Sequence, residues 1–376
     1  MSLLRTASGR RAAASGGGTP AARATRTKRV TATGRGASPA ARVTVQAHAK
    51  LNLGLAVGPR RDDGFHDLVT VFQSVSLADT LIAERRVRGF SLRVRHESAA
   101  VRGRHDVQAQ RVVRADASNL VLRAARLVAS GLGLAGGARF TLVKRIPAQA
   151  GLGGGSADAA AAIVALCALY GHRLTRSERI RYGLQLGSDV PFALSGGTML
   201  GMGQGEVLSR LRLEAPFRAI IAMPKWRVST AEAFRRHDAD RKHLTPWKHH
   251  LRFAMSVGRQ RVEALSLMRQ GNRFEQLLGR RRYEFASLCN RLRAAGLLQP
   301  RLTGSGSAVF AIMPRGGSIR EIAGRFAGDE PLYEVRSVAK GLQLQLHASS
   351  TRPRTGARGD VPSPRDGLRR RRTRAS

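Results

Sequence analysis

A glycine-rich loop that runs directly into an alanine-rich apolar segment constrains this chain more than any other feature. It spans residues 147–160, and glycines occupy positions 151, 153, 154 and 155. Residues 138–144 alternate between apolar and polar side chains, which predicts a strand before the loop, and the apolar run predicts a helix from about Ser156. Glycine lets the backbone approach a ligand, and the free N–H groups of a helix start attract anions. The segment therefore predicts a phosphate-binding loop.

A glycine-rich loop can also belong to one of three different kinds of structure. A Walker P-loop ends in glycine, lysine and serine or threonine, but Gly155 is followed by Ser156 and Ala157, which excludes that motif. A dinucleotide fingerprint needs an acidic residue closing a second strand about 20 residues later. Only Glu178 is near, in a polar helix-like stretch. A tight turn before a packed helix that binds nothing stays open on the loop alone.

An alternating segment lies upstream of the loop. Every odd position from 43 to 57 is apolar, and the even positions include Thr44, Gln46, His48, Lys50 and Asn52. A strand would place these polar side chains on one face. A solvated strand face accounts for the pattern as well as a binding face does. Turn-forming residues follow at 60–64 and a second strand at 65–75, so a hairpin would place Phe65 and His66 at its mouth.

Five motifs in order now support a family resemblance. Residues 47–53, 63–66, 147–160, 186–192 and 301–310 resemble the motifs of the GHMP kinase superfamily, and the resemblance covers residues 43–345. Within the superfamily they are similar to the kinases that act on a cytidine diphosphate-linked methylerythritol. The resemblance implies an α+β fold with two domains. The first would be like ribosomal-protein-S5 domain 2, the second would be ferredoxin-like, and the active site would lie between them.

The expected organisation has four parts. Residues 1–42 and 350–376 form disordered basic tails, because they combine arginine with small and polar residues and contain almost no large apolar ones. Residues 43–210 form the ATP-binding N-terminal domain, and residues 211–349 form the C-terminal domain. By resemblance, the loop at 304–306 closes the cleft.

The activity implied by the resemblance is transfer of the ATP γ-phosphoryl group to the 2-hydroxyl of the methylerythritol unit, in the non-mevalonate route to isopentenyl diphosphate. An attacking alcohol must lose its proton, and the transferred group needs charge stabilisation. Asp189 stands where family members carry the catalytic aspartate, and Lys50 would lie beside it, keeping it ionised and orienting the hydroxyl. Without the resemblance, Asp189 is accounted for as an N-cap or loop residue before Pro191.

The resemblance also places ATP, with Mg²⁺, along the glycine loop. Ser156 is the candidate for a phosphate or magnesium contact, and phosphates and water would supply most metal ligands, because no carboxylate cluster is visible in the sequence. Asp158 could contact the metal, but it is interpreted first as a first-turn acid favoured by the helix dipole. Asn119 matches a position near the base but also fits a helix cap. The expected nucleotide-binding residues are Asn119, Pro147, Ala148, Gln149, Ala150, Gly151, Leu152, Gly153, Gly154, Gly155, Ser156 and Ala157.

The resemblance implies that an aromatic-histidine pair, Phe65 and His66, recognises the cytosine, the histidine by hydrogen bonding and the aromatic ring by stacking. Phe234 is the candidate for a second stacking ring, although a core phenylalanine on an amphipathic helix accounts for it too. The expected substrate-binding residues are Asn52, Phe65, His66, Asp189 and Phe234.

The chain departs from the family pattern at three places. Gln149 and Ala150 replace part of a longer glycine run, Ala157 and Asp158 stand where serine and asparagine are common, and Phe65 stands where tyrosine is frequent. These changes alter residues expected at the phosphate and metal contacts but keep the stacking face and the Lys50–Asp189 pair.

Charge is the unusual part of the composition. The formal net charge is +40, of which the tails carry +9 and +7, so the remaining chain is itself basic. The acid-free N-terminal tail suits an organelle transit peptide. Because the arginine and alanine bias runs through the whole chain, we favour a bacterial cytoplasmic protein, with the plastid stroma as the alternative. Two cysteines, Cys167 and Cys289, are expected as buried free thiols.

A different class of function is a nucleic-acid-binding protein with basic tails. Aromatic residues are only 5%, there is no recognition-helix signature, and the glycine loop and Asp189 would have no role. The charge predicts non-specific binding of polyanions through the tails. The longest apolar run is too short to cross a bilayer, so no membrane is expected. We expect a monomer or weak homodimer.

Overall fold

The structure is a computed structural model that describes residues 40–102, 113–240, 247–257 and 261–347. The predicted tails at 1–42 and 350–376 lie outside the described residues, apart from 40–42. The described residues belong to one compact unit. No helix among them is long and apolar enough to cross a membrane.

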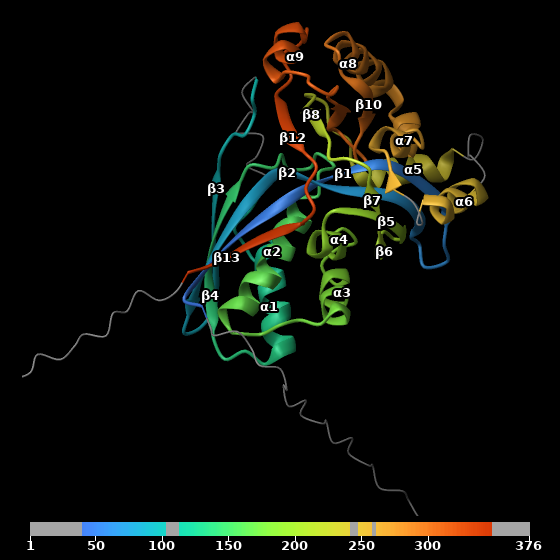
Figure 1. Cartoon of the computed structure of the whole chain (residues 1–376). Coiled ribbons are helices and arrows are strands. Elements are labelled where there is room, and N and C mark those ends of the chain that lie inside the picture. The colour runs from blue at the N-terminus through green and yellow to red at the C-terminus, as the bar shows by residue number, and fades with distance from the viewer. Residues whose placement is uncertain (1–39, 103–112, 241–246, 258–260, 348–376) are drawn as a thin grey trace, which may run out of the picture. The chain divides into compact units, whose positions relative to one another are not determined.

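A long hairpin forms the centre of the first sheet (Figure 1). Strand β1 (Arg42–Arg60) pairs antiparallel with β2 (His66–Arg86), as the alternation and the turn residues predict. The strand order is β13-β1-β2-β4-β3, and β5 pairs with the first part of β2 and with β6. The other strands are β3 (Phe90–His96), β4 (Gly137–Lys144), β5 (Thr198–Gly203), β6 (Val207–Arg210) and β13 (Leu342–His347).

Helices cover one face of this sheet (Figure 1). The elements are α1 (Leu120–Leu132), α2 (Gly154–Leu169), α3 (Arg176–Leu184) and α4 (Val190–Ser195). Helix α2 lies against β1 and β2 and is buried on nearly every side, which its alanines permit because they let neighbouring elements approach closely. The helix begins at Gly154, two residues earlier than predicted. The expected buried helix is confirmed.

The second group of elements surrounds a four-stranded sheet of order β10-β11-β8-β12. Its strands pair antiparallel, and helices lie between most of them in the sequence, so the second half is also α+β. Its strands are β8 (Arg218–Ala222), β10 (Leu298–Leu302), β11 (Val309–Ile312) and β12 (Leu332–Arg336). Its helices are α5 (Thr230–Ala239), α6 (Trp247–Val257), α7 (Ala264–Met268), η2 (Arg273–Leu277), η3 (Gly279–Arg281), α8 (Arg282–Ala294) and α9 (Ile319–Arg325), and two short strands, β7 (Arg212–Leu213) and β9 (Arg261–Val262), pair with each other.

One expected strand is two strands in the structure. The sequence from Glu334 to Leu346 suggests a single final strand, but β12 ends at Arg336 and β13 begins at Leu342. Residues 340 and 341 lie in the connection between them, and β13 joins the first sheet beside β1, with Arg42 opposite His347. A single strand is wrong because Lys340 and Gly341 interrupt the segment, and the chain passes there from one sheet to the other. Cys167 and Cys289 are free and buried, as expected.

Candidate active site

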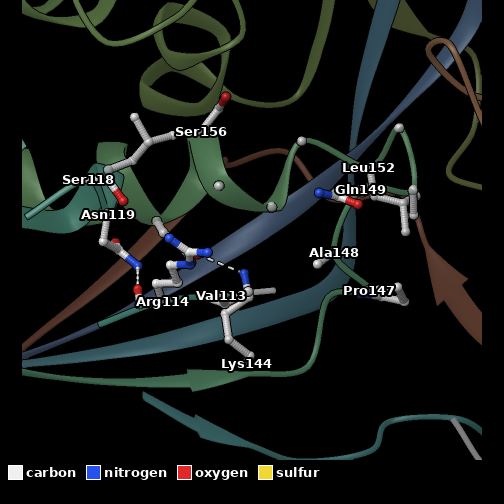
Figure 2. A pocket seen from close by; sticks show the side chains of 17 residues that line it. Val113, Arg114, Ser118, Asn119, Lys144, Pro147, Ala148, Gln149, Leu152 and Ser156 are labelled. Atoms are coloured by element: carbon white, nitrogen blue, oxygen red, sulfur yellow. Dashed lines mark hydrogen bonds and ion pairs between the residues drawn. The ribbon is translucent and has the colours of Figure 1, made fainter. Parts of the chain in front are cut away.

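The glycine loop forms one wall of a cavity of about 420 Å³ (Figure 2). All residues from Pro147 to Ser156 line it, together with Asn119, Arg114 and Lys144. The N-cap of α2 is Gly153, whose φ of 69° lies in the left-handed region, and no side chain caps the helix. The first N–H groups of α2 therefore face the cavity without a side-chain acceptor, which suits a phosphate.

A second loop packs directly against the first. A Cβ at Gly151 would come within 2.1 Å of the Thr303 carbonyl oxygen, so only glycine fits there. The Ala308 N–H donates to the Ala150 carbonyl at 3.1 Å, and the Gly304 N–H donates to Asn52 Oδ1 at 2.9 Å. The loop at 303–306 therefore rests on the glycine loop and on β1.

The polar face of β1 is buried where it reaches these loops. Lys50 and Asn52 are 6% and 3% exposed, so the solvated strand face is wrong for this part of β1. Lys50 Nζ donates to Asn52 Oδ1 at 2.6 Å and lies 3.5 Å from Asp189 Oδ2. The Asn52 amide also donates to Thr70 Oγ1 at 2.8 Å. Asn52 thus holds Lys50 and Gly304 in place, and its amide is already engaged.

Asp189 lies at the start of α4, next to a second cavity. It is the N-cap residue, but its side chain makes no capping hydrogen bond. A capping role therefore does not explain why a carboxylate stands at this position. The side chain is 33% exposed. The second cavity has a volume of about 630 Å³, and its walls include Phe65, His66, Ser188, Asp189 and Phe234.

Ser156 connects the two cavities, because it lines both of them. In Figure 2 its side chain points away from Asn119 and Lys144, which lie on the other side of the helix start. A group held by the glycine loop could therefore reach, past Ser156, a second molecule beside Asp189.

His66 and Phe234 lie together in the second cavity. Their rings stack with centroids 5.1 Å apart and an interplanar angle of 29°. Phe234 also meets Phe274 edge to face, so it is both a core residue and a cavity wall. Phe65 is 54% exposed at the hairpin turn. The sequence did not indicate Asp238, whose Oδ1 lies 2.6 Å from His66 Nε2.

Two further residues at the first cavity, Asn119 and Gln149, have backbone or capping roles in the structure. Asn119 caps α1 by accepting a hydrogen bond from the Val121 N–H at 2.9 Å, and it also lines the first cavity. The geometry of this residue therefore fits a helix cap and a nucleotide contact alike. Gln149 has a φ of 55°, in the region that favours glycine, which agrees with the glycine that the family pattern carries there.

A buried charge cluster that the sequence analysis missed supports both ends of the glycine loop. Lys144, the last residue of β4, pairs with Asp79 and lies 2.7 Å from Asp158 Oδ2. Asp79 Oδ1 also accepts hydrogen bonds from the N–H groups of Arg145, at 2.6 Å, and Ile146, at 2.9 Å. Burial raises the pKa of Asp158, and the two carboxylates hold the pKa of Lys144 above its usual value.

This cluster corrects the interpretation of Asp158. The residue is fifth in α2, past the first turn, and 3% exposed, so it is a buried ion-pair partner and not an acid favoured by the helix dipole. The signal that could have revealed the cluster is a charge inside an apolar run, at Asp79 in residues 75–83 and at Lys144 after residues 140–143. A buried charge needs a partner.

Glu275 supports the loop at 303–306, and its titration gives a first prediction. Its Oε1 accepts from the Leu302 N–H at 2.8 Å, and burial raises its pKa to about 7. Since the folded pKa exceeds the unfolded value, stability should fall as the pH rises from about 4.5 to about 7. This fall in the free energy of unfolding should be smaller by about 2–3 kcal/mol in the variant Glu275→Gln, because the amide does not titrate. Urea unfolding of both proteins at pH 5 and pH 8 checks it, and equal pH dependence would contradict it.

Comparison with known proteins agrees with this geometry. The family model for the GHMP kinases N terminal domain matches residues 119–197, which include the glycine loop and Asp189. A 4-diphosphocytidyl-2-C-methyl-D-erythritol kinase from Moorella thermoacetica is 37% identical over 289 residues, which are 77% of this chain and 96% of the relative.

Two solved structures resemble the chain. The crystal structure of a 4-(cytidine 5'-diphospho)-2C-methyl-D-erythritol kinase matches with a TM-score of 0.59 and 32% identity, over 78% of this chain and 98% of that one. A homoserine kinase from Cytophaga hutchinsonii matches with a TM-score of 0.58 at 17% identity, over 81% of this chain and 98% of that one, and it shares the fold. By its sequence and its fold, the chain belongs to the 4-diphosphocytidyl-2-C-methyl-D-erythritol kinases of the GHMP kinase superfamily.

Proposed function

We propose that this protein transfers the γ-phosphoryl group of ATP to the 2-hydroxyl of 4-diphosphocytidyl-2-C-methyl-D-erythritol. The step belongs to the non-mevalonate route to isopentenyl diphosphate. The observation that carries the proposal is the pair of cavities that meet at Ser156, one lined by the glycine loop and the other by Asp189, Phe65 and His66. The names of the relatives support the choice of substrate.

The glycine loop and the start of α2 are proposed to hold the phosphates. The uncapped N–H groups and the absence of side chains at Gly153 and Gly154 suit a polyphosphate, since backbone donors can approach it from several directions. A Cβ at Gly153 would lie 2.9 Å from Lys50 Cγ, so the loop and the catalytic pair are in direct contact. Asn119 is proposed to lie near the base.

Asp189 is proposed as the group that accepts the proton of the attacking hydroxyl, with Lys50 orienting it. Lys50 is fixed by Asn52 and lies within ion-pair distance of Asp189, while the carboxylate itself reaches the substrate cavity. A proton acceptor must touch both its positioning partner and the reacting group. In this arrangement Asn52 acts mainly by holding Lys50, and its contact with the substrate remains a prediction.

Magnesium is part of the proposal and would neutralise phosphate charge when bound. Among the described residues, no group of three histidine, cysteine, aspartate or glutamate side chains could hold a metal. Phosphate oxygens and water would therefore supply most ligands, as is common for Mg²⁺, and the Ser156 hydroxyl is the candidate protein ligand. A bacterial cytoplasmic location is part of the same proposal, because the relatives are bacterial.

The test is release of ADP by the full-length protein with Mg-ATP and one alcohol in each reaction. The alcohols are 4-diphosphocytidyl-2-C-methyl-D-erythritol, homoserine and mevalonate. We expect release only with the cytidine compound, because only that substrate can use Phe65, His66 and Phe234. Release with homoserine or mevalonate instead would overturn the substrate assignment, and no release with any alcohol would overturn the proposed function.

A further inference from the structure

The further inference concerns Asp238, the carboxylate beside the histidine of the substrate cavity. It rests on the proposed function, because it explains how the protonation of His66, the residue proposed to recognise cytosine, is fixed. His66 comes from the start of β2 and Asp238 from α5, and 172 positions separate them in the sequence. The two side chains meet at the wall of the second cavity, which both of them line.

The contact determines which ring nitrogen of His66 carries hydrogen. Asp238 Oδ1 lies 2.6 Å from His66 Nε2, and an ionised carboxylate can only accept a hydrogen bond. The hydrogen must therefore be on Nε2. In a neutral imidazole the other nitrogen then has a lone pair and can only accept. His66 Nδ1 has no hydrogen-bond partner within the part of the chain that the structure describes.

Burial and neighbouring rings restrict the orientation of the His66 imidazole. The His66 side chain is 5% exposed, while that of Asp238 is 34% exposed. Phe234 stacks on one side of the imidazole, and His237 meets it at 5.2 Å with an interplanar angle of 79°. His237 is itself held by the Gly58 carbonyl at 3.0 Å. A ring that is fixed in this way keeps Nδ1 in a constant orientation at the cavity that His66 lines.

We propose that Asp238 is a specificity-determining residue that fixes His66 as a hydrogen-bond acceptor and so selects cytosine over uracil. Cytosine carries an amino group at C4, which donates, whereas uracil carries a carbonyl oxygen there, which accepts. An acceptor nitrogen on His66 pairs with the cytosine amino group and faces the uracil oxygen with two lone pairs opposed. Asp238 acts through His66 and is a positioning residue.

The variant Asp238→Asn tests this, because an amide can donate as well as accept and no longer requires the hydrogen on Nε2. The probes are 4-diphosphocytidyl-2-C-methyl-D-erythritol and its uridine counterpart, compared by kcat/KM at pH 8. We expect the cytidine-to-uridine ratio to fall about 10- to 100-fold, through loss with cytidine and gain with uridine. Nitrogen-15 shifts of the His66 ring should show Nε2 protonated in the natural protein and a change of tautomer in the variant.

The matched control is Glu232→Gln, the same change of carboxylate to amide on α5. Glu232 pairs with Arg236 and does not line the cavity, so the ratio should stay constant. The inference is overturned if Nδ1 carries the hydrogen in the natural protein, or if Asp238→Asn leaves tautomer and ratio unchanged. A changed ratio with an unchanged tautomer also overturns it. If the natural protein is inactive on the cytidine compound, the proposed function itself fails, which is a separate result.

Discussion

The variant Asp189→Asn is expected to lower kcat by about 10²–10⁴-fold while nucleotide binding stays close to that of the natural protein. An amide has the same shape as the carboxylate but cannot accept the proton of the attacking hydroxyl. The change should leave the fold intact, because the Asp189 side chain makes no capping hydrogen bond. Steady-state ADP release gives kcat, and calorimetric titration with a non-hydrolysable ATP analogue gives the affinity.

A suitable control for this experiment is Asp329→Asn. Asp329 is an exposed carboxylate that pairs with Lys225 and lines neither cavity of the site. Its replacement should leave kcat unchanged. If Asp189→Asn keeps more than about a tenth of the natural kcat, Asp189 is not the proton acceptor, since such a group contributes at least about 10²-fold.

The largest effect on stability is expected from Asp79→Ala, about 3–5 kcal/mol of unfolding free energy. Asp79 is fully buried and accepts hydrogen bonds from Lys144 and from the N–H groups of Arg145 and Ile146. Its removal leaves the buried N–H of Ile146 and the half-buried N–H of Arg145 without their acceptor, and it leaves Lys144 with Asp158 as its one carboxylate within the described residues. Urea unfolding at pH 7.5, followed by circular dichroism, measures the loss.

The control here is Asp67→Ala, which removes an exposed carboxylate from the same strand. Asp67 pairs with Arg61 at the surface, where water screens the charges, so the urea midpoint should hardly move. Equal midpoints for Asp79→Ala and Asp67→Ala would show that the buried cluster does not support the loop. A protein that unfolds at lower urea but keeps its ATP affinity would limit the cluster to a general role in stability.

Local sequence patterns were enough to predict the elements that carry the site. Alternation predicted β1, and the glycine loop before an apolar run predicted α2, because both signals arise from neighbouring residues. The resemblance then indicated Lys50, Asp189, His66 and Phe234, and the structure brings Lys50 close to Asp189 and the other two into one cavity with it.

Long-range pairs could not be predicted in this way. Asp79 meets Lys144 across 65 positions, and His66 meets Asp238 across 172. A charged residue within an apolar segment indicates that it has a buried partner of opposite charge. The segment itself does not indicate which residue that partner is. The pairing of β13 with β1 was not predicted either, since it depends on the path of the intervening chain.

The position of β13 has a consequence for the order of events during synthesis. The strand that carries Lys50 leaves the ribosome early, but its neighbour on one side, residues 342–347, is translated some 300 positions later. Until then β1 has an open edge, and Gly341 cannot yet accept the hydrogen bond from His48. Pairing over so long a separation is slow, since loop closure precedes it. The nascent chain therefore holds its Lys50 strand in an unfinished sheet, and a ribosome stalled before residue 342 would display a protein whose first sheet lacks the edge strand that pairs with residues 42–47.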